Sequence, residues 1–231
     1  MLETNALTAF YGDYQALFGI DIRISPGEVV AVIGANGAGK TTSMRAITGM
    51  LPCESEMVRW KGEPIGHLRA DQIASLGIAM VPEGRQLFPS LTVEENLMIG
   101  GRSRRPGVWN IEALYELFPV LSERRKQAST SLSGGQQQLT AIGRALMSNP
   151  EVILFDEISL GLAPIVIQQV YEALPNIINQ GVAAIIVEQD INRALSVSDR
   201  VYCLSEGRVA LEGASGDVTR DATTRAYFGT H

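Results

Sequence analysis

The chain has 231 residues, enough for one large domain or for a core that carries a small subdomain. Its formal net charge of −6 weighs against a general nucleic-acid binder, which usually has a basic surplus. The longest apolar stretches have the length of a strand, so none predicts a membrane span, and residues 1–5 lack a secretory signal. Cys53 and Cys203 belong to no metal-binding motif, which is typical of two buried thiols in a reducing cytoplasm.

Short apolar runs alternate with helical stretches along the chain, which predicts an α/β fold. Strands are expected at residues 20–24, 29–33, 57–60 and 77–81. A glycine-rich segment follows the second of these strands, and a helix is expected to begin at Lys40 and to end near Thr48.

Residues 83–149 differ in character, because most of them follow helical periodicity. We interpret them as a helical subdomain inserted into a catalytic core of residues 1–82 and 150–231. After the insertion we expect a strand at 152–155, a helix at 165–178, a strand at 183–187, a helix at 191–197 and a hairpin at 201–211. Within the insertion, residues 100–107 form the most loop-like segment. Its arginines, Arg102, Arg104 and Arg105, favour a solvated basic loop over a binding patch.

The glycine-rich segment matches the phosphate-binding pattern G-x-x-x-x-G-K-[ST] in full. The matching residues are Gly34, Ala35, Asn36, Gly37, Ala38, Gly39, Lys40 and Thr41. Small residues allow the backbone amides to surround the β- and γ-phosphates, and Lys40 adds a positive charge there. The Thr41 hydroxyl is a candidate Mg²⁺ ligand, and Thr42 adds a donor near the α-phosphate. We call residues 34–41 the phosphate loop.

An apolar strand at residues 152–155 ends in two acids, Asp156 and Glu157. A carboxylate at the end of a buried strand can hold Mg²⁺, which makes Asp156 the candidate metal ligand. The chain turns at a strand end, so Glu157 can face the γ-phosphate and act as general base toward the attacking water. The alternative, a polar strand end that faces solvent, loses weight because a phosphate loop lies upstream.

The run Leu132-Ser133-Gly134-Gly135-Gln136 lies between the phosphate loop and the paired acids. A hydroxyl and two glycine amides at the start of a predicted helix are suited to bind an anion. We call residues 132–136 the signature segment.

Taken in this order, the motifs resemble the ATP-binding subunits of ABC transporters over nearly the whole chain. The resemblance implies a P-loop NTPase core of the ABC ATPase type, with an inserted α-helical subdomain and an N-terminal antiparallel β-subdomain. It implies ATP and Mg²⁺ as cofactors and a head-to-tail dimer that sandwiches ATP. In that dimer Ser133, Gly134 and Gly135 would contact the γ-phosphate on the opposite subunit. Tyr11 matches the aromatic residue that stacks on adenine.

Finer features are similar to the second ATPase subunit of branched-chain amino acid importers. They are the run of residues 81–85, the segment 87–97, Val187-Glu188-Gln189, and the ending Ala226-Tyr227-Phe228-Gly229. The resemblance implies separate membrane permease subunits, a second ATPase subunit that is a copy or a paralogue, and indirectly a periplasmic or extracellular binding protein. It places the chain in the cytoplasm, peripheral on the inner face of the membrane. Alternative cargoes are urea and lipopolysaccharide, and a soluble ABC ATPase of DNA repair or translation is a third reading.

Two positions depart from the pattern that is usual in ABC ATPases. Glu83 stands where most members carry a glutamine that joins the Mg²⁺ and water shell, and its carboxylate still offers an oxygen to the metal. Gln189 stands where most members carry a histidine that contacts the γ-phosphate. An amide donates a hydrogen bond but cannot take up a proton or a charge, so Glu157 is the favoured base. Ile158 replaces the proline or small residue that often follows the glutamate.

Overall fold

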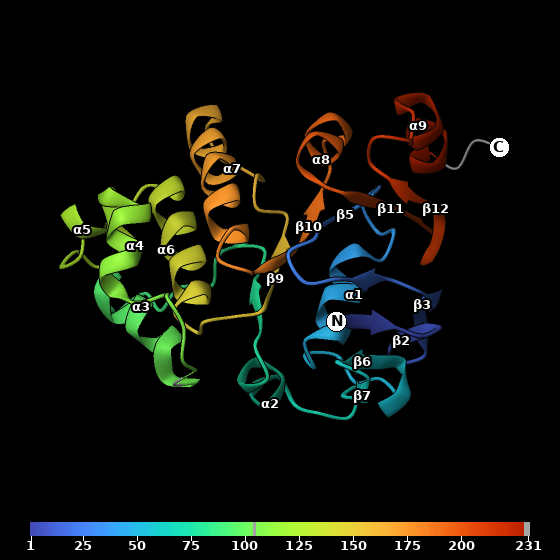
Figure 1. Cartoon of the computed structure of the whole chain (residues 1–231), viewed down its shortest axis with the longest axis horizontal. Helices are drawn as coiled ribbons and strands as arrows, with labels where there is room; N and C mark the ends of the chain where they lie inside the picture. The colour runs from blue at the N-terminus through green and yellow to red at the C-terminus, as the bar shows by residue number, and fades with distance from the viewer. Residues whose placement is uncertain (104, 229–231) are drawn as a thin grey trace. The chain divides into compact units, whose positions relative to one another are not determined.

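The computed structural model describes residues 1–103 and 105–228, which form two compact units (Figure 1). The first unit contains Met1–Ile73 and the chain from Ala183 onward, and the second contains Ala74–Val182. Throughout the described part of the chain, each helix is too short or too polar to span a bilayer.

The first unit contains three groups of strands. Their bounds are β1 Leu2–Thr4, β2 Leu7–Tyr11, β3 Tyr14–Ile20, β4 Arg23–Ile24, β5 Val29–Gly34, β6 Val58–Trp60, β7 Glu63–Pro64, β10 Ala183–Glu188, β11 Arg200–Ser205 and β12 Arg208–Ala214. An antiparallel sheet has the order β4-β1-β6-β7, and β2 pairs with β3 as an antiparallel hairpin. In the third group β11, β5 and β10 run parallel, and β12 lies antiparallel on β11. The expected N-terminal antiparallel β-subdomain is therefore present.

Burial explains why the sequence forms these strands. Every residue of β5 and β10 is buried, as the unbroken apolar runs of parallel strands require when both of their faces are covered. By contrast, β12 alternates between exposed and half-buried residues, which is typical of an outer antiparallel strand. The buried central strands form a rigid base for the loops that follow them.

Helices cover the two faces of these central strands. Their bounds are α1 Lys40–Ile47, α8 Ile191–Val197 and α9 Arg220–Phe228, with a 3₁₀ turn at Ser55–Met57 and with α2 Ala70–Ser75 at the sequence boundary between the units. Helices α8 and α9 lie on one side of β5 and β11, and α1 lies on the other (Figure 1). The core beneath α8 is built from Ala31, Ile33, Ala194, Val201 and Cys203.

The two cysteines differ in their surroundings. Cys203 is buried, and burial raises the pKa of its thiol to about 11, so the thiol stays protonated at neutral pH. Cys53 is only half-buried, and its thiol lies 3.5 Å from the carbonyl of Gly66. The expectation of two buried thiols is therefore right for Cys203 and wrong for Cys53.

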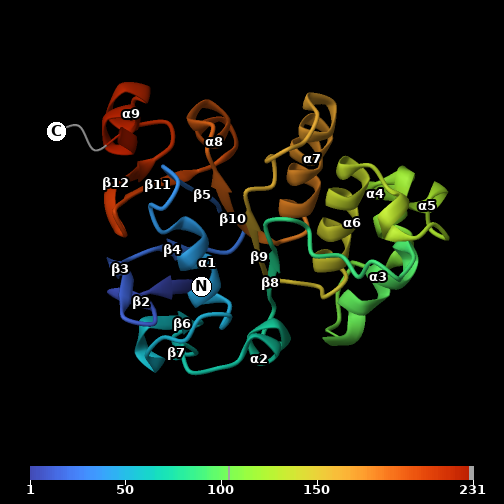
Figure 2. The ribbon, with the colours of Figure 1, turned by 180° about the vertical axis from the view of Figure 1, so that it is seen from behind.

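The second unit combines a strand pair with a group of helices. The bounds are β8 Ile78–Val81, β9 Val152–Asp156, α3 Val93–Gly100, α4 Ile111–Leu117, α5 Pro119–Glu123, α6 Gly134–Leu146 and α7 Pro164–Ile178, with 3₁₀ turns at Gly101–Ser103 and Ser129–Ser131. Strands β8 and β9 are parallel. Helix α6 packs against α3 and α5 (Figure 2). The α3–α6 contact is close because Gly143 has no side chain: a Cβ there would lie 2.7 Å from Leu97 Cδ2.

Three further features of the structure differ from the sequence interpretation. The strand expected at residues 20–24 is interrupted, because β3 ends at Ile20 and β4 contains only Arg23–Ile24. Helix α9 was not expected, because its stretch of threonines and arginines shows no apolar periodicity. In the predicted basic loop, Arg105 is not a solvated side chain. It forms an ion pair of 2.8 Å with Glu151 and donates to the carbonyls of Asn149 and Ser75, so it has a structural role. Arg104, in the same segment, lies outside the described residues, as does Gly229.

Candidate functional site

The phosphate loop lies between β5 and α1, and its backbone requires glycine. Gly37 and Gly39 have φ values of 83° and 105°, in the left-handed region that side chains disfavour. A Cβ on Gly39 would also lie 2.7 Å from Leu17 Cδ2, whereas a Cβ on Gly37 would meet nothing within 4 Å. The loop is therefore packed against the fold at Gly39 and open at Gly37, where a ligand can approach the backbone.

Lys40 supplies the positive charge of this loop. It is the first residue of α1 and is only 4% exposed. Its Nζ donates to the carbonyl oxygens of Gly34 at 2.8 Å and Ala35 at 3.1 Å, so the ammonium group lies inside the curve of the loop. A buried cation, glycine-rich backbone and the N-terminus of a helix together favour a bound phosphate group.

Tyr11 lies beside the same helix. It ends β2, opposite Tyr14, and 43% of its surface is exposed. Its hydroxyl oxygen lies 3.5 Å from Thr42 Oγ1, the residue that follows the phosphate loop. An exposed aromatic ring tethered near a phosphate site is suited to stack on a nucleotide base.

The end of β10 also lies next to the phosphate loop. In the parallel β5–β10 pair, Glu188 lies opposite Ile33, and Gln189 follows with an exposed side chain. Glu188 is 1% exposed, accepts a hydrogen bond from the backbone N–H of Gln189 at 3.2 Å, and lies 3.8 Å from Arg193 Nη1. Sequence reasoning assigned no role to Glu188. An acid at the end of an apolar strand was the available signal, and the same signal identified Asp156.

The second unit contains the other predicted carboxylates. Asp156 ends β9 and is 2% exposed. Glu157 has a φ of 52°, so the chain turns there and the alternation of the strand does not continue. Val81 of β8 pairs with Phe155 of β9, which places Glu83 and Asp156 beyond the same edge of this strand pair. Among the described residues, no group of three His, Cys, Asp or Glu side chains forms a metal cluster.

The signature segment begins α6 with a capping box. The Ser133 hydroxyl oxygen accepts from the backbone N–H of Gln136 at 3.3 Å, and the Gln136 side chain accepts from the Ser133 N–H at 3.0 Å. A hydroxyl that accepts one bond still has a proton to donate to an anion. Gly135 packs against Val166 of α7, and a Cβ there would lie 2.9 Å from Val166 Cγ1. The absence of a side chain at Gly135 is thus required by the fold itself.

The predicted site residues consequently form two sets. Tyr11, the phosphate loop and Gln189 belong to the first unit, whereas Glu83, the signature segment and the pair Asp156 and Glu157 belong to the second. Within each set, the structure places the residues at strand ends and helix starts, where ligands of α/β proteins bind.

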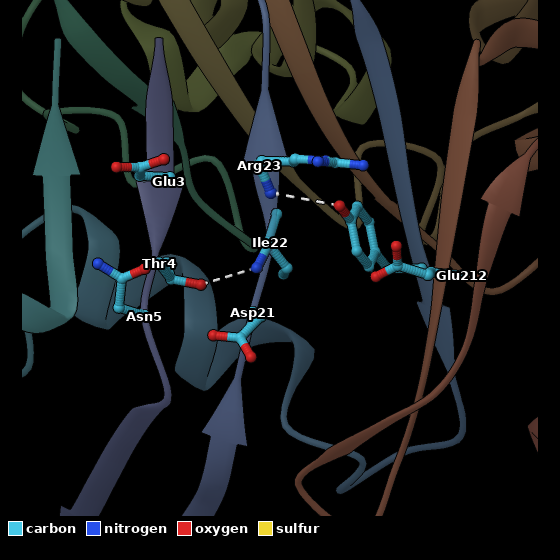
Figure 3. Close-up of a pocket in the computed structure, with 8 residues that line it drawn as sticks. Glu3, Thr4, Asn5, Asp21, Ile22, Arg23 and Glu212 are labelled. Atoms are coloured by element: carbon cyan, nitrogen blue, oxygen red, sulfur yellow. Dashed lines mark hydrogen bonds between the residues drawn. The ribbon is translucent and has the colours of Figure 1, made fainter. Parts of the chain in front are cut away.

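A separate cavity in the first unit contains none of these residues (Figure 3). Its volume is about 290 Å³, and it is lined by Glu3, Thr4, Asn5, Asp21, Ile22, Arg23, Tyr202 and Glu212. The Tyr202 hydroxyl accepts from the backbone N–H of Arg23 at 3.3 Å, and Thr4 Oγ1 accepts from that of Ile22 at 2.8 Å (Figure 3). The first bond joins β4 to β11, and the second joins β1 to the link between β3 and β4, so the polar groups of the cavity contribute to the fold.

Comparison with known proteins identifies the family to which a chain with this phosphate loop and signature segment belongs. The sequence profile of the ABC transporter family matches residues 17–159. The chain belongs to this family. It is an ABC ATP-binding subunit and an ATPase, and the predicted resemblance and α/β fold class are confirmed.

The relatives of this ABC ATPase cover nearly its whole length. The high-affinity branched-chain amino acid transport ATP-binding protein BraG of Pseudomonas aeruginosa is 42% identical over 99% of this chain and 100% of BraG. The probable branched-chain amino acid transport ATP-binding protein LivF of Archaeoglobus fulgidus is 33% identical over 94% of each chain. Among solved structures, a dimeric ATP-binding cassette in a post-hydrolysis state, bound to ADP and Pi, has a TM-score of 0.82 at 26% identity. The similarity covers 93% of this chain and 99% of that one.

Proposed function

We propose that this ATPase supplies the energy for import of branched-chain amino acids through separate membrane permease subunits. The observation that carries the cargo assignment is the 42% identity to BraG over 99% of this chain. LivF, a second relative whose name gives the same cargo, supports it. The acidic net charge and the family membership leave little support for a DNA-repair or translation ATPase.

In this proposal the phosphate loop and α1 bind the phosphates of ATP. The open side of the loop at Gly37 and the buried Lys40 ammonium group support this role. Tyr11 stacks on the adenine, and Thr42 donates near the α-phosphate. The side chains of Thr41, Asp156 and Glu83 fit Mg²⁺, because all three offer the hard oxygen ligands that this ion prefers. When bound, Mg²⁺ neutralises charge on the phosphate oxygens.

Glu157 is the proposed general base, which would orient the attacking water and accept its proton. Gln189 would donate a hydrogen bond to the γ-phosphate without acting as an acid or a base. Ser133, Gly134 and Gly135 would contact the γ-phosphate held by the opposite subunit of a head-to-tail dimer. The dimeric ADP-bound and Pi-bound cassette of similar fold supports the dimer.

The proposal also includes partners and location. ABC ATPase subunits work with membrane permeases, and here residues 83–149 would form the helical subdomain that contacts them, with residues 1–82 and 150–231 as the catalytic core. The dimer partner is a second copy or a paralogous ATPase. A periplasmic or extracellular binding protein would deliver the cargo, while this chain stays cytoplasmic, at the inner face of the membrane.

Transport by the reconstituted complex tests the proposal. The chain is co-purified with its permease subunits and partner ATPase and placed in proteoliposomes. With the binding protein added, the complex is assayed for ATP-dependent uptake of leucine, urea and glutamate. We expect leucine uptake that disappears in the Lys40→Ala variant. Uptake of urea alone, or leucine uptake that survives Lys40→Ala, would contradict the proposal.

A further inference from the structure

A short segment of the second unit, residues 83–88, has an unfavourable backbone that a neighbouring helix holds in place. Arg85 and Gln86 both have left-handed conformations, with φ values of 66° and 44°. Two consecutive non-glycine residues remain in this region only when their surroundings impose it. Arg144 of α6 provides that constraint, because its guanidinium donates to the Gln86 carbonyl at 2.8 Å and to the Arg85 carbonyl at 3.0 Å. We call residues 83–88 the strap.

The end of the strap is equally well anchored. The backbone N–H of Phe88 donates to Asn96 Oδ1 at 2.9 Å, and its carbonyl accepts from Ser129 Oγ at 2.8 Å. The Asn96 side chain is fully buried, whereas the Phe88 ring is 46% exposed. The strap is thus a fixed segment that presents an exposed aromatic ring.

A second connection leads from the strap to the start of α6. Arg85 Nη1 donates to Gln137 Oε1 at 3.3 Å. The same amide group uses its Nε2 to donate to the carbonyls of Leu132 at 3.4 Å and Ser129 at 3.1 Å. Gln137 therefore receives a hydrogen bond from the strap and donates one to the first residue of the signature segment.

The position of Arg85 has no explanation in helix stability. Its guanidinium lies against Gly134, where an added Cβ would be 3.2 Å from Nη2. Gly134 is the first residue of α6, and a positive charge at a helix N-terminus opposes the helix dipole. Helix stability therefore does not explain the contact between Arg85 and Gly134. A role of Arg85 in orienting the signature segment does explain it.

We propose that Arg85 is a positioning residue of the signature segment, acting through Gln137. The inference rests on the proposed function, in which the signature segment closes on ATP held by the opposite subunit. Arg85 of the fixed strap holds the Gln137 amide at 3.3 Å, and that amide in turn holds the backbone carbonyl of Leu132 at 3.4 Å. The strap thereby sets the orientation in which the signature segment meets the γ-phosphate.

The test separates ATP binding from ATP-driven dimer closure. All variants are made in the Glu157→Gln background, where hydrolysis is blocked. ATP binding to the chain is measured by fluorescence with a labelled nucleotide, and ATP-driven dimer formation by light scattering, with the second ATPase subunit added if the chain does not pair with itself. Thermal unfolding confirms that each variant is folded.

We expect Arg85→Gln and Gln137→Glu to leave binding to the phosphate loop unchanged. Each should raise the ATP concentration needed for half-maximal dimer formation by about fivefold to tenfold, the equivalent of one or two hydrogen bonds. Gln137→Glu keeps an acceptor for Arg85 but removes the donor to Leu132, so the double variant should match the single ones. Arg124→Gln, at an exposed arginine elsewhere in this unit, is the control and should change nothing.

Three results would overturn the inference: unchanged dimer formation in either variant, additive effects in the double variant, or an equal loss of nucleotide binding. If the Glu157→Gln parent bound ATP but never formed a dimer with either partner, the proposed dimer itself would be wrong. Arg85→Lys is a further check, because lysine keeps the positive charge but lacks the planar guanidinium group that contacts Gln137. Full rescue by lysine would show that charge alone matters and would contradict positioning through Gln137.

Discussion

Replacement of Gly135 by alanine tests whether the signature glycine serves the fold as well as a ligand. The new Cβ would clash most severely with Val166 Cγ2 and would also lie 2.9 Å from Val166 Cγ1, well inside the ordinary carbon–carbon separation of about 3.5–4.0 Å. Overpacking of this kind costs about 1–3 kcal/mol. Alanine in a helix recovers about 0.5–1 kcal/mol relative to glycine. We therefore expect Gly135→Ala to lower the free energy of unfolding by about 1–2 kcal/mol.

A double-mutant cycle with Val166→Ala isolates the contact. Chemical denaturation of wild type, both single variants and the double variant gives the coupling energy, which we expect to be about 1–2 kcal/mol in favour of the double variant. Gly134→Ala is the matched control, because its Cβ would meet only the flexible end of Arg85. Additive effects, or a Gly135→Ala variant of wild-type stability that only loses ATPase activity, would show that the glycine serves the ligand alone.

Four further variants test the helix cap of α3, the phosphate loop and Gln189. Thr92→Ala removes the capping box of α3, and chemical denaturation at pH 7 should show a loss of about 1 kcal/mol. The N–H and hydroxyl of Thr92 lower the pKa of Glu95, so that this stabilisation is present above the ordinary carboxyl pKa and declines as the pH falls through the lowered value. The difference between wild type and Thr92→Ala should therefore narrow in acid, and a difference that grows would refute this assignment. In the phosphate loop, Gly37→Ala introduces backbone strain alone and should cost about 1 kcal/mol, whereas Gly39→Ala adds a steric clash and should cost more in the same unfolding assay. Equal losses would contradict this difference. For Gln189→His we expect preserved or increased ATP turnover in a phosphate-release assay, and complete loss would reveal a role for the amide beyond hydrogen bonding.

Much of the fold could be predicted from the sequence because its signals are local. The unbroken apolar runs of β5 and β10 indicate strands buried on both faces, and the glycine pattern before Lys40 indicates a loop that opens a helix. The start of α6 at Gly134 also has a local signal, because Ser133 and Gln136 form the capping box that begins the helix.

The remainder depends on contacts between residues distant in sequence. The sequence around Arg105 predicts a solvated loop residue. The ion pair between Arg105 and Glu151 forms only because folding brings the two residues together. The sequence around Gly135 predicts a ligand-binding glycine. Its contact with Val166 cannot be predicted from the sequence, because it depends on the packing of α6 against α7. The same holds for Arg85 and Gln137, which lie 52 residues apart in the chain.

We propose that this ABC ATPase hydrolyses ATP with Glu157 as the general base. The most direct measurement is steady-state phosphate release by Glu157→Gln beside equilibrium ATP binding by the same protein. Loss of a general base lowers turnover by about 10²–10⁴-fold, so we predict that turnover nearly disappears while ATP affinity is retained. Undiminished phosphate release in the Glu157→Gln variant would show that Glu157 is not the general base.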